Sequence, residues 1–236
     1  MIKQSLKILI NLFFLFFLSS CTDFFSTSWA KWAVRDPSKL IPNVTLGNVN
    51  DLIDMAENDP GLSFEVLQKI AEAAAKASGD EKAGLQAAAV GAAVNAVGLG
   101  QTIIGVAGDL ANIDTGNTDD AKSLAISAIN NMPNLEGTGD ALYNMLPSPG
   151  SDEFDRFVEN ASAEDLAMAA VLLLAGDAKK NGGDSDDYEN YVDGFRDDPS
   201  PQAELAIALA ESIKTKPDAE LPSSIQSILD GLNLGS

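Results

Sequence analysis

The chain of 236 residues contains no histidine and one cysteine, Cys21. A Ser-His-Asp triad needs an imidazole base, and the common zinc sites are built on cysteine and histidine. One cysteine cannot form an internal disulfide. These shortages exclude histidine triads, Cys/His zinc sites and internal disulfides, and any thiolate chemistry would have to come from Cys21 itself.

Basic side chains are also scarce, with 15 Lys and Arg against 35 Asp and Glu and a formal net charge of −20. Such a chain would repel a phosphate backbone, so we expect no nucleic-acid partner. Residues 112–236 hold 24 acids and 7 bases, whereas residues 21–111 hold 11 acids and 6 bases. The carboxyl-terminal half is therefore the acidic half, and an anionic membrane surface would keep it at a distance.

The first twenty residues have the pattern of a secretory signal segment. Lys3 and Lys7 precede an apolar run at residues 8–18 that only Asn11 interrupts, and two serines follow. The run is about eleven residues long, whereas a spanning helix needs roughly 20. The pattern predicts that residues 1–20 are a cleaved signal peptide and not a permanent transmembrane helix.

Leu18-Ser19-Ser20-Cys21 resembles the lipobox of bacterial lipoproteins. The resemblance implies that the thiol of Cys21 receives a diacylglyceryl group, that cleavage precedes the cysteine, and that the new amino group is acylated. Two or three acyl chains anchor a protein stably, at roughly 0.8 kcal/mol per buried CH₂. The alternative is an ordinary signal peptide that ends near an unrelated cysteine.

The resemblance also bears on location. In lipoproteins of bacteria with two membranes, an aspartate directly after the cysteine retains the protein at the inner membrane. Here Thr22 holds that position and Asp23 follows. The resemblance therefore favours the outer membrane, and cleavage would leave a mature chain with 13 bases, 35 acids and a net charge of −22.

An aromatic cluster, formed by Phe24, Phe25, Trp29 and Trp32, follows the expected anchor. Aromatic rings next to bases suit the headgroup zone of a membrane, and Trp29 and Trp32 would share one side of a short helix. The same rings could instead pack on the domain. Both interpretations stay open for this membrane-proximal segment, residues 21–46.

Apolar residues recur at helical spacing in the remaining chain, residues 47–236, which we expect to form one all-helical domain. Start signals include the pair Ser162 and Asp165, and Ser200 before Pro201; Gly176 is a stop signal. Helices are expected at about 48–58, 63–78, 80–97, 100–112, 118–132, 138–146, 151–160, 162–176, 186–195, 201–214 and 222–232. The predicted fold is all-α, an irregular multi-helix bundle or stacked helical pairs, with an α-solenoid as second choice.

Residues 83–108 form a stretch of 26 residues without a charge, rich in Ala, Gly and Val. Its length would admit a membrane span, but Ala and Gly drive insertion weakly. Small residues let helices approach closely, so we expect a buried core helix that breaks near Gly98. A membrane-inserting or self-associating segment is the alternative. The stretch is not a phosphate loop because no Lys-Ser or Lys-Thr follows its glycines.

Acidic motifs in the second half carry weak signals. Asp114-Thr115-Gly116 matches the aspartic-protease triplet, but no second copy exists, and a turn explains it better. Asp184, Asp186, Asp187 and Glu189 could offer oxygen ligands to Ca²⁺, although the EF-hand order is missing. Charge runs are usually solvated faces. We expect no metal site and no cofactor besides the covalent lipid.

Three functions remain open on this evidence. The first is a non-enzymatic, lipid-anchored domain that binds an envelope protein partner as a scaffold, transport accessory or surface antigen. Its composition and anchor resemble the helical lipoproteins of spirochaetes and, more distantly, those associated with TRAP-type transporters. The second is a carrier whose apolar cavity is lined by residues 85–108. The third is an acid-dependent hydrolase, which needs two inward-facing carboxylates in a cleft, and no catalytic pair can be picked out from the sequence.

Overall fold

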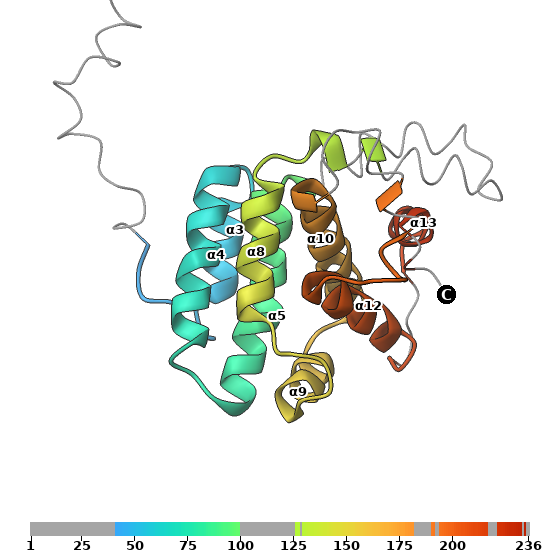
Figure 1. Cartoon of the computed structure of the whole chain (residues 1–236). Helices are drawn as coiled ribbons and strands as arrows, with labels where there is room; N and C mark the ends of the chain where they lie inside the picture. Colours follow the sequence, from blue (N-terminus) through green and yellow to red (C-terminus); the bar gives the residue numbers. More distant parts are fainter. Residues whose placement is uncertain are drawn as a thin grey trace, which may run out of the picture. The chain divides into compact units, whose positions relative to one another are not determined.

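The computed structural model describes residues 41–99, 126–127, 129–181, 190–191, 194–216, 221–232 and 234. The chain divides into residues 1–40 and residues 41–236, and the architecture below is that of the second unit. Its described residues form helices and connecting turns without a strand, which confirms the predicted all-α class. Figure 1 labels the helices α3 (Val49–Ala56), α4 (Pro60–Ala74), α5 (Gly79–Ala96), α8 (Leu135–Met145), α9 (Asp152–Asn160), α10 (Ala163–Asn181), α12 (Pro201–Ile213) and α13 (Ser223–Gly231).

Helix α10 is enclosed by α8, α12, α5 and α13. Between Leu166 and Ala178 its residues are buried all around the helix, with Met168 as the partly exposed exception, and its charges gather at the two ends apart from Asp177. A helix that is apolar all round has to be enclosed. Helices α8 and α12 pack closely against α10, and α5 and α13 also contact it. The described helices of the second unit therefore form an irregular bundle, in which α10 and α5 each contact several other helices (Figure 1).

Two glycines let α8 and α10 approach closely. A Cβ on Gly139 would lie 3.2 Å from the Cα of Gly176 and 3.0 Å from Nε2 of Gln202. Gln202 is buried at this crossing and donates from Nε2 to the backbone oxygen of Leu173, at 2.8 Å. The crossing of α8 and α10 thus depends on two missing side chains and one satisfied buried amide.

Helices α3, α4 and α5 form the amino-terminal part of the bundle. Leu46, just before α3, lies against Gly84 of α5, and Ile53 of α3 lies against Gly91 of α5. Ile53 follows Leu46 by seven residues, and Gly91 follows Gly84 by the same number, which is about two helical turns. Both segments therefore advance together, so α3 and α5 run in the same direction. The glycines of the uncharged stretch therefore act as recesses for larger side chains.

The described part of the uncharged stretch, residues 83–99, is a core element as expected. Ala89, Ala92, Ala93 and Ala96 are fully buried in α5. Helix α5 ends where predicted, with Gly98 at φ +61° directly after its last turn. Across the residues that the structure describes, no helix combines the length and hydropathy needed to cross a membrane. Residues 100–108 lie outside the described residues.

Several predicted starts are confirmed by their hydrogen bonds. The backbone N–H of Asp165 donates to Ser162 Oγ at 3.0 Å, and the N–H of Ser162 donates back to Asp165 Oδ2 at 3.0 Å, which is a capping box. The N–H of Ala203 donates to Ser200 Oγ at 3.1 Å, with Pro201 at the first helical position. These local signals position the starts of α10 and α12 correctly.

Four predicted boundaries differ from the structure by three residues or more: the end of α10, both ends of α4 and the start of α8. Helix α10 does not stop at Gly176 but continues to Asn181, because Gly176 serves the close approach to Gly139 and not a helix end. Helix α4 begins at Pro60, three residues earlier than expected, because Asp59 caps it by accepting a hydrogen bond from the N–H of Leu62 at 3.0 Å.

We expect Gly139→Ala to destabilise the protein by about 1–3 kcal/mol, since the new methyl group would overpack the crossing with α10. In an exposed helix the same change stabilises by up to about 1 kcal/mol. Gly137→Ala is the matched control, because a Cβ there would meet Phe64 Cζ at an ordinary 3.6 Å. Urea unfolding of both variants measures the difference, and an equal response of the two would contradict the close crossing.

Candidate functional site

The residues predicted to attach the chain to a membrane belong to the first unit. Cys21, Phe24, Phe25, Trp29 and Trp32 lie outside the described residues. Lipidation of the cysteine and the role of the aromatic cluster therefore stay predictions.

The acidic candidates are likewise outside the described residues. This applies to Asp184, Asp186, Asp187 and Glu189, and to the triplet at residues 114–116. Among the residues whose placement is described, no group of three or more Asp, Glu or Cys side chains is arranged to hold a metal ion. Calcium binding by the acidic run accordingly stays a prediction without structural support.

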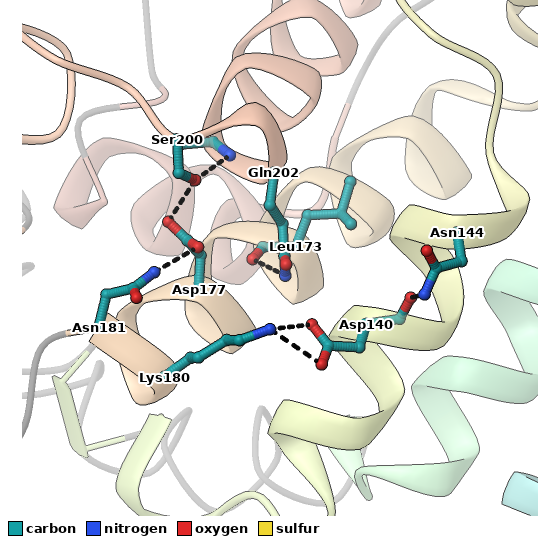
Figure 2. Close-up of polar contacts among 9 residues, drawn as sticks. Asp140, Asn144, Leu173, Asp177, Lys180, Asn181, Ser200 and Gln202 are labelled. Atoms are coloured by element: carbon teal, nitrogen blue, oxygen red, sulfur yellow. Dashed lines mark hydrogen bonds and ion pairs between the residues drawn. The ribbon is translucent and has the colours of Figure 1, made fainter.

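The best-defined polar cluster surrounds Asp177, whose carboxylate is 3% exposed near the end of α10. Figure 2 shows two of its partners: Ser200 Oγ donates to Oδ2 at 2.7 Å, and Asn181 Nδ2 donates to Oδ1 at 2.8 Å. The hydroxyl of Tyr191 also donates to Oδ2. Three donors from three segments thus satisfy one buried carboxylate, which we call the Asp177 cluster.

The cluster links elements that are distant in sequence. The hydroxyl of Ser200 accepts from the first turn of α12 while it donates to Asp177, so the carboxylate lies one hydrogen bond from the positive end of that helix. The ring of Tyr191 stacks on the buried ring of Phe195, with centroids 6.0 Å apart. Asp177 therefore ties the end of α10 to the segment around Tyr191 and to the start of α12.

The protonation of Tyr191 follows from this environment. Burial raises the pKa of the Tyr191 hydroxyl above its ordinary value of 10, and its hydrogen bond to Asp177 raises the pKa further. A neutral phenol that donates to a carboxylate is the stable form at physiological pH. The pair therefore provides a fixed hydrogen bond and no general base from the tyrosine.

A second polar link joins α8 to α10 beside the cluster. Nζ of Lys180 lies 3.0 Å from Asp140 Oδ1, and this hydrogen bond raises the pKa of the lysine ammonium (Figure 2). Both side chains are partly exposed, so the ion pair contributes little to stability. The ion pair joins the same two helices, α8 and α10, that cross at Gly139, so it helps to fix their relative position.

The Asp177 cluster does not supply the pair of carboxylates that the hydrolase hypothesis requires. Asp177 is the one acid among the described residues that is fully buried, and its acceptor positions are taken by Tyr191, Ser200 and Asn181. Hydrolysis by two acids would need a second carboxyl group in the same cleft as Asp177. Within the described residues the cluster is a structural clamp.

The described residues line surface clefts with volumes of about 370, 530 and 600 Å³. The 370 Å³ cleft lies between residues 41–44, α4 and the start of α5. The 530 Å³ cleft lies between α4, α5 and α8, and the 600 Å³ cleft lies between α8 and the start of α12. All three clefts are open to the surface. The carrier hypothesis expected residues 85–108 to line a cavity, but most of the described residues 85–99 pack into the core. Leu85 is the residue of this range that lines the smallest cleft.

Sequence reasoning identified Ser200 as a helix cap but missed its second role at Asp177. One signal was present: Asp177 is the one charged residue in the apolar run from Leu166 to Ala178. A charge within such a run demands buried partners. Those partners could not be named, because Tyr191 and Ser200 lie 14 and 23 residues further along the chain.

The raised pKa of Tyr191 predicts a loss of stability at alkaline pH. Below pH 10 the phenol is protonated in both the folded and the unfolded chain, so its contribution is fully present. Above pH 10 the unfolded chain releases this proton while the folded chain retains it, and the free energy of unfolding therefore falls. Thermal melts at pH 8 and pH 11 should show a smaller alkaline loss for Tyr191→Phe than for the wild type.

Tyr143→Phe is the matched control for this prediction, since Tyr143 lines the cleft beside α12 and does not contact Asp177. It should lose as much stability as the wild type between the two pH values. Equal alkaline losses for all three proteins would show that Tyr191 is not held protonated by the fold.

Comparison with known proteins adds no relative to this geometry. The chain matches no family model, no curated protein and no solved structure. The functional argument therefore rests on the residues and contacts described above.

Proposed function

We propose that this chain is a lipid-anchored, non-enzymatic domain of a bacterial cell envelope, attached through Cys21, that binds a protein partner with its acidic half. The observation that carries the proposal is Leu18-Ser19-Ser20-Cys21, placed directly after a short apolar run at the start of the chain. A covalent lipid at this position would leave residues 41–236 outside the bilayer.

The outer surface of the bundle supports a binding role. Apart from Asp177, the described acids are partly or fully exposed, including Glu204 and Glu211 on α12. With 24 acids and 7 bases, residues 112–236 create a negative field that would attract a basic surface and speed its association. A partner with a basic face is therefore the chemistry that this half of the chain fits.

The interior argues for a support role over a carrier role. The described small residues of α5 are covered by neighbouring helices, and Gly84 and Gly91 receive Leu46 and Ile53. A core filled in this way holds its surface in one shape. The carrier hypothesis now depends on residues 100–108, outside the described part of the chain.

The proposal predicts the chemical state of the amino terminus. Expressed with its signal segment in a bacterium that processes lipoproteins, the wild type should have a mature amino terminus at acylated Cys21 and should enter the detergent phase on Triton X-114 partitioning. Cys21→Ser should leave the detergent phase, because the thiol that accepts the lipid is gone. Intact mass and phase partitioning measure both.

Thr22→Ser is the control, since it alters the neighbouring residue and keeps the thiol. Its mass should show the same acylation as the wild type. Membrane retention of Cys21→Ser after complete signal cleavage would contradict a lipid anchor.

In-cell cross-linking from Glu204 and Glu211 should capture one partner in a salt-sensitive manner, and the absence of any cross-linked protein would contradict the binding role.

A further inference from the structure

The 370 Å³ cleft lies where the chain enters the second unit. One wall of the cleft is formed by residues 41–44, which precede α3, and the other walls come from α4, the turn after it and the start of α5. The volume falls within the range of about 300–1,000 Å³ that small-molecule sites occupy. The cleft is therefore large enough for a ligand of the size of a lipid headgroup.

Two opposite charges face this cleft without a bond to each other. Lys76 follows the end of α4, and Glu81 lies in the first turn of α5. Neither side chain makes a hydrogen bond or an ion pair with another described residue. Lys69 and Glu72, which also line the cleft, differ in this respect because they pair with each other at 3.0 Å.

The cleft thus has no net charge but offers one unused cation and one unused anion. A purely anionic ligand would meet both Glu72 and Glu81, and a purely cationic ligand would meet both lysines. A zwitterion satisfies both unused groups, with its anion at Lys76 and its cation at Glu81. The charge pattern therefore fits a ligand that carries a phosphate and an ammonium group.

The remaining lining is apolar. Ile41 and Leu85 are buried at the cleft, with Val44 partly buried beside them. Such surfaces suit the glycerol and the first methylenes of a lipid more than they suit water. A headgroup that continues into a hydrocarbon chain combines the polar and apolar features that the cleft offers.

We propose that this cleft binds the headgroup of phosphatidylethanolamine, with Lys76 holding the phosphate and Glu81 holding the ammonium. The inference rests on the proposed anchorage in one respect, the choice of a membrane lipid over a soluble phosphate ester. Attachment at Cys21 would hold the chain at a membrane, so a lipid headgroup would be a local ligand for the cleft.

The test uses residues 21–236 with Cys21→Ser, so that no attached lipid contributes. Co-flotation with vesicles of equal parts phosphatidylethanolamine and phosphatidylcholine is compared with co-flotation with phosphatidylcholine alone. We expect stronger binding to the mixed vesicles, because the quaternary ammonium of phosphatidylcholine has no N–H to donate to Glu81. Lys76→Gln and Glu81→Gln should each weaken the phosphatidylethanolamine-dependent part about tenfold, the effect of losing a hydrogen bond to a charged group.

Lys214→Gln and Glu57→Gln are the matched controls, since they make the same chemical changes at exposed positions that do not line the cleft. Both should bind as the parent does. Equal flotation with the two vesicle types, or unchanged binding by Lys76→Gln and Glu81→Gln, would overturn the proposal. Binding of soluble glycerophosphoethanolamine without flotation would also overturn it, in favour of a soluble ligand.

This experiment is independent of the test of the anchor. The assay protein lacks the thiol, so its result does not depend on acylation in the cell. A failure at the cleft would leave the evidence for Cys21 unchanged, and a failure of acylation would leave the headgroup measurement unchanged. The two proposals can therefore fail separately.

Discussion

The burial of α10 is the constraint on which the rest of the bundle depends. A helix whose residues from Leu166 to Ala178 are almost all buried has no face to offer to water. Each fully buried Leu or Val contributes roughly 1.5–3 kcal/mol relative to exposure. The helices that contact α10, namely α8, α12, α5 and α13, are therefore held where they cover it. The packing of α8 and α12 on α10 follows, and Gly139 and Gly176 set how closely α8 can approach.

The same constraint explains the Asp177 cluster. A carboxylate in a buried helix is costly unless it is hydrogen-bonded on all sides. Here Tyr191, Ser200 and Asn181 provide these bonds, so the demand of one residue in α10 determines where the segment before α12 and the start of α12 lie. The outer helices are then free to carry the charges that a binding surface needs.

Local signals were enough to predict the class of the fold and several helix ends, but contacts between distant residues were not predictable. Ser162 and Ser200 cap neighbouring backbone groups, so their roles can be read from adjacent residues. The reason for Gly176 lies across the bundle at Gly139, and without it a glycine near an expected end resembles a stop. At the 370 Å³ cleft, Glu72 lies three residues after Lys69 and four before Lys76, so helical spacing allows either pair and the structure shows the first. The membrane-attachment residues predicted from the sequence lie outside the described residues, so their evidence is still the motif around Cys21.

Native-state hydrogen exchange of the chain tests the burial of α10 most directly. If α8, α12, α5 and α13 enclose α10, its amides from Leu166 to Asp177 should exchange through global unfolding alone and be the slowest in the protein. Amides of α3 and α13, which lie at the edge of the bundle, should open with a lower free energy. Exchange of the α10 amides through openings of lower free energy than those of α3 would contradict this account of the fold.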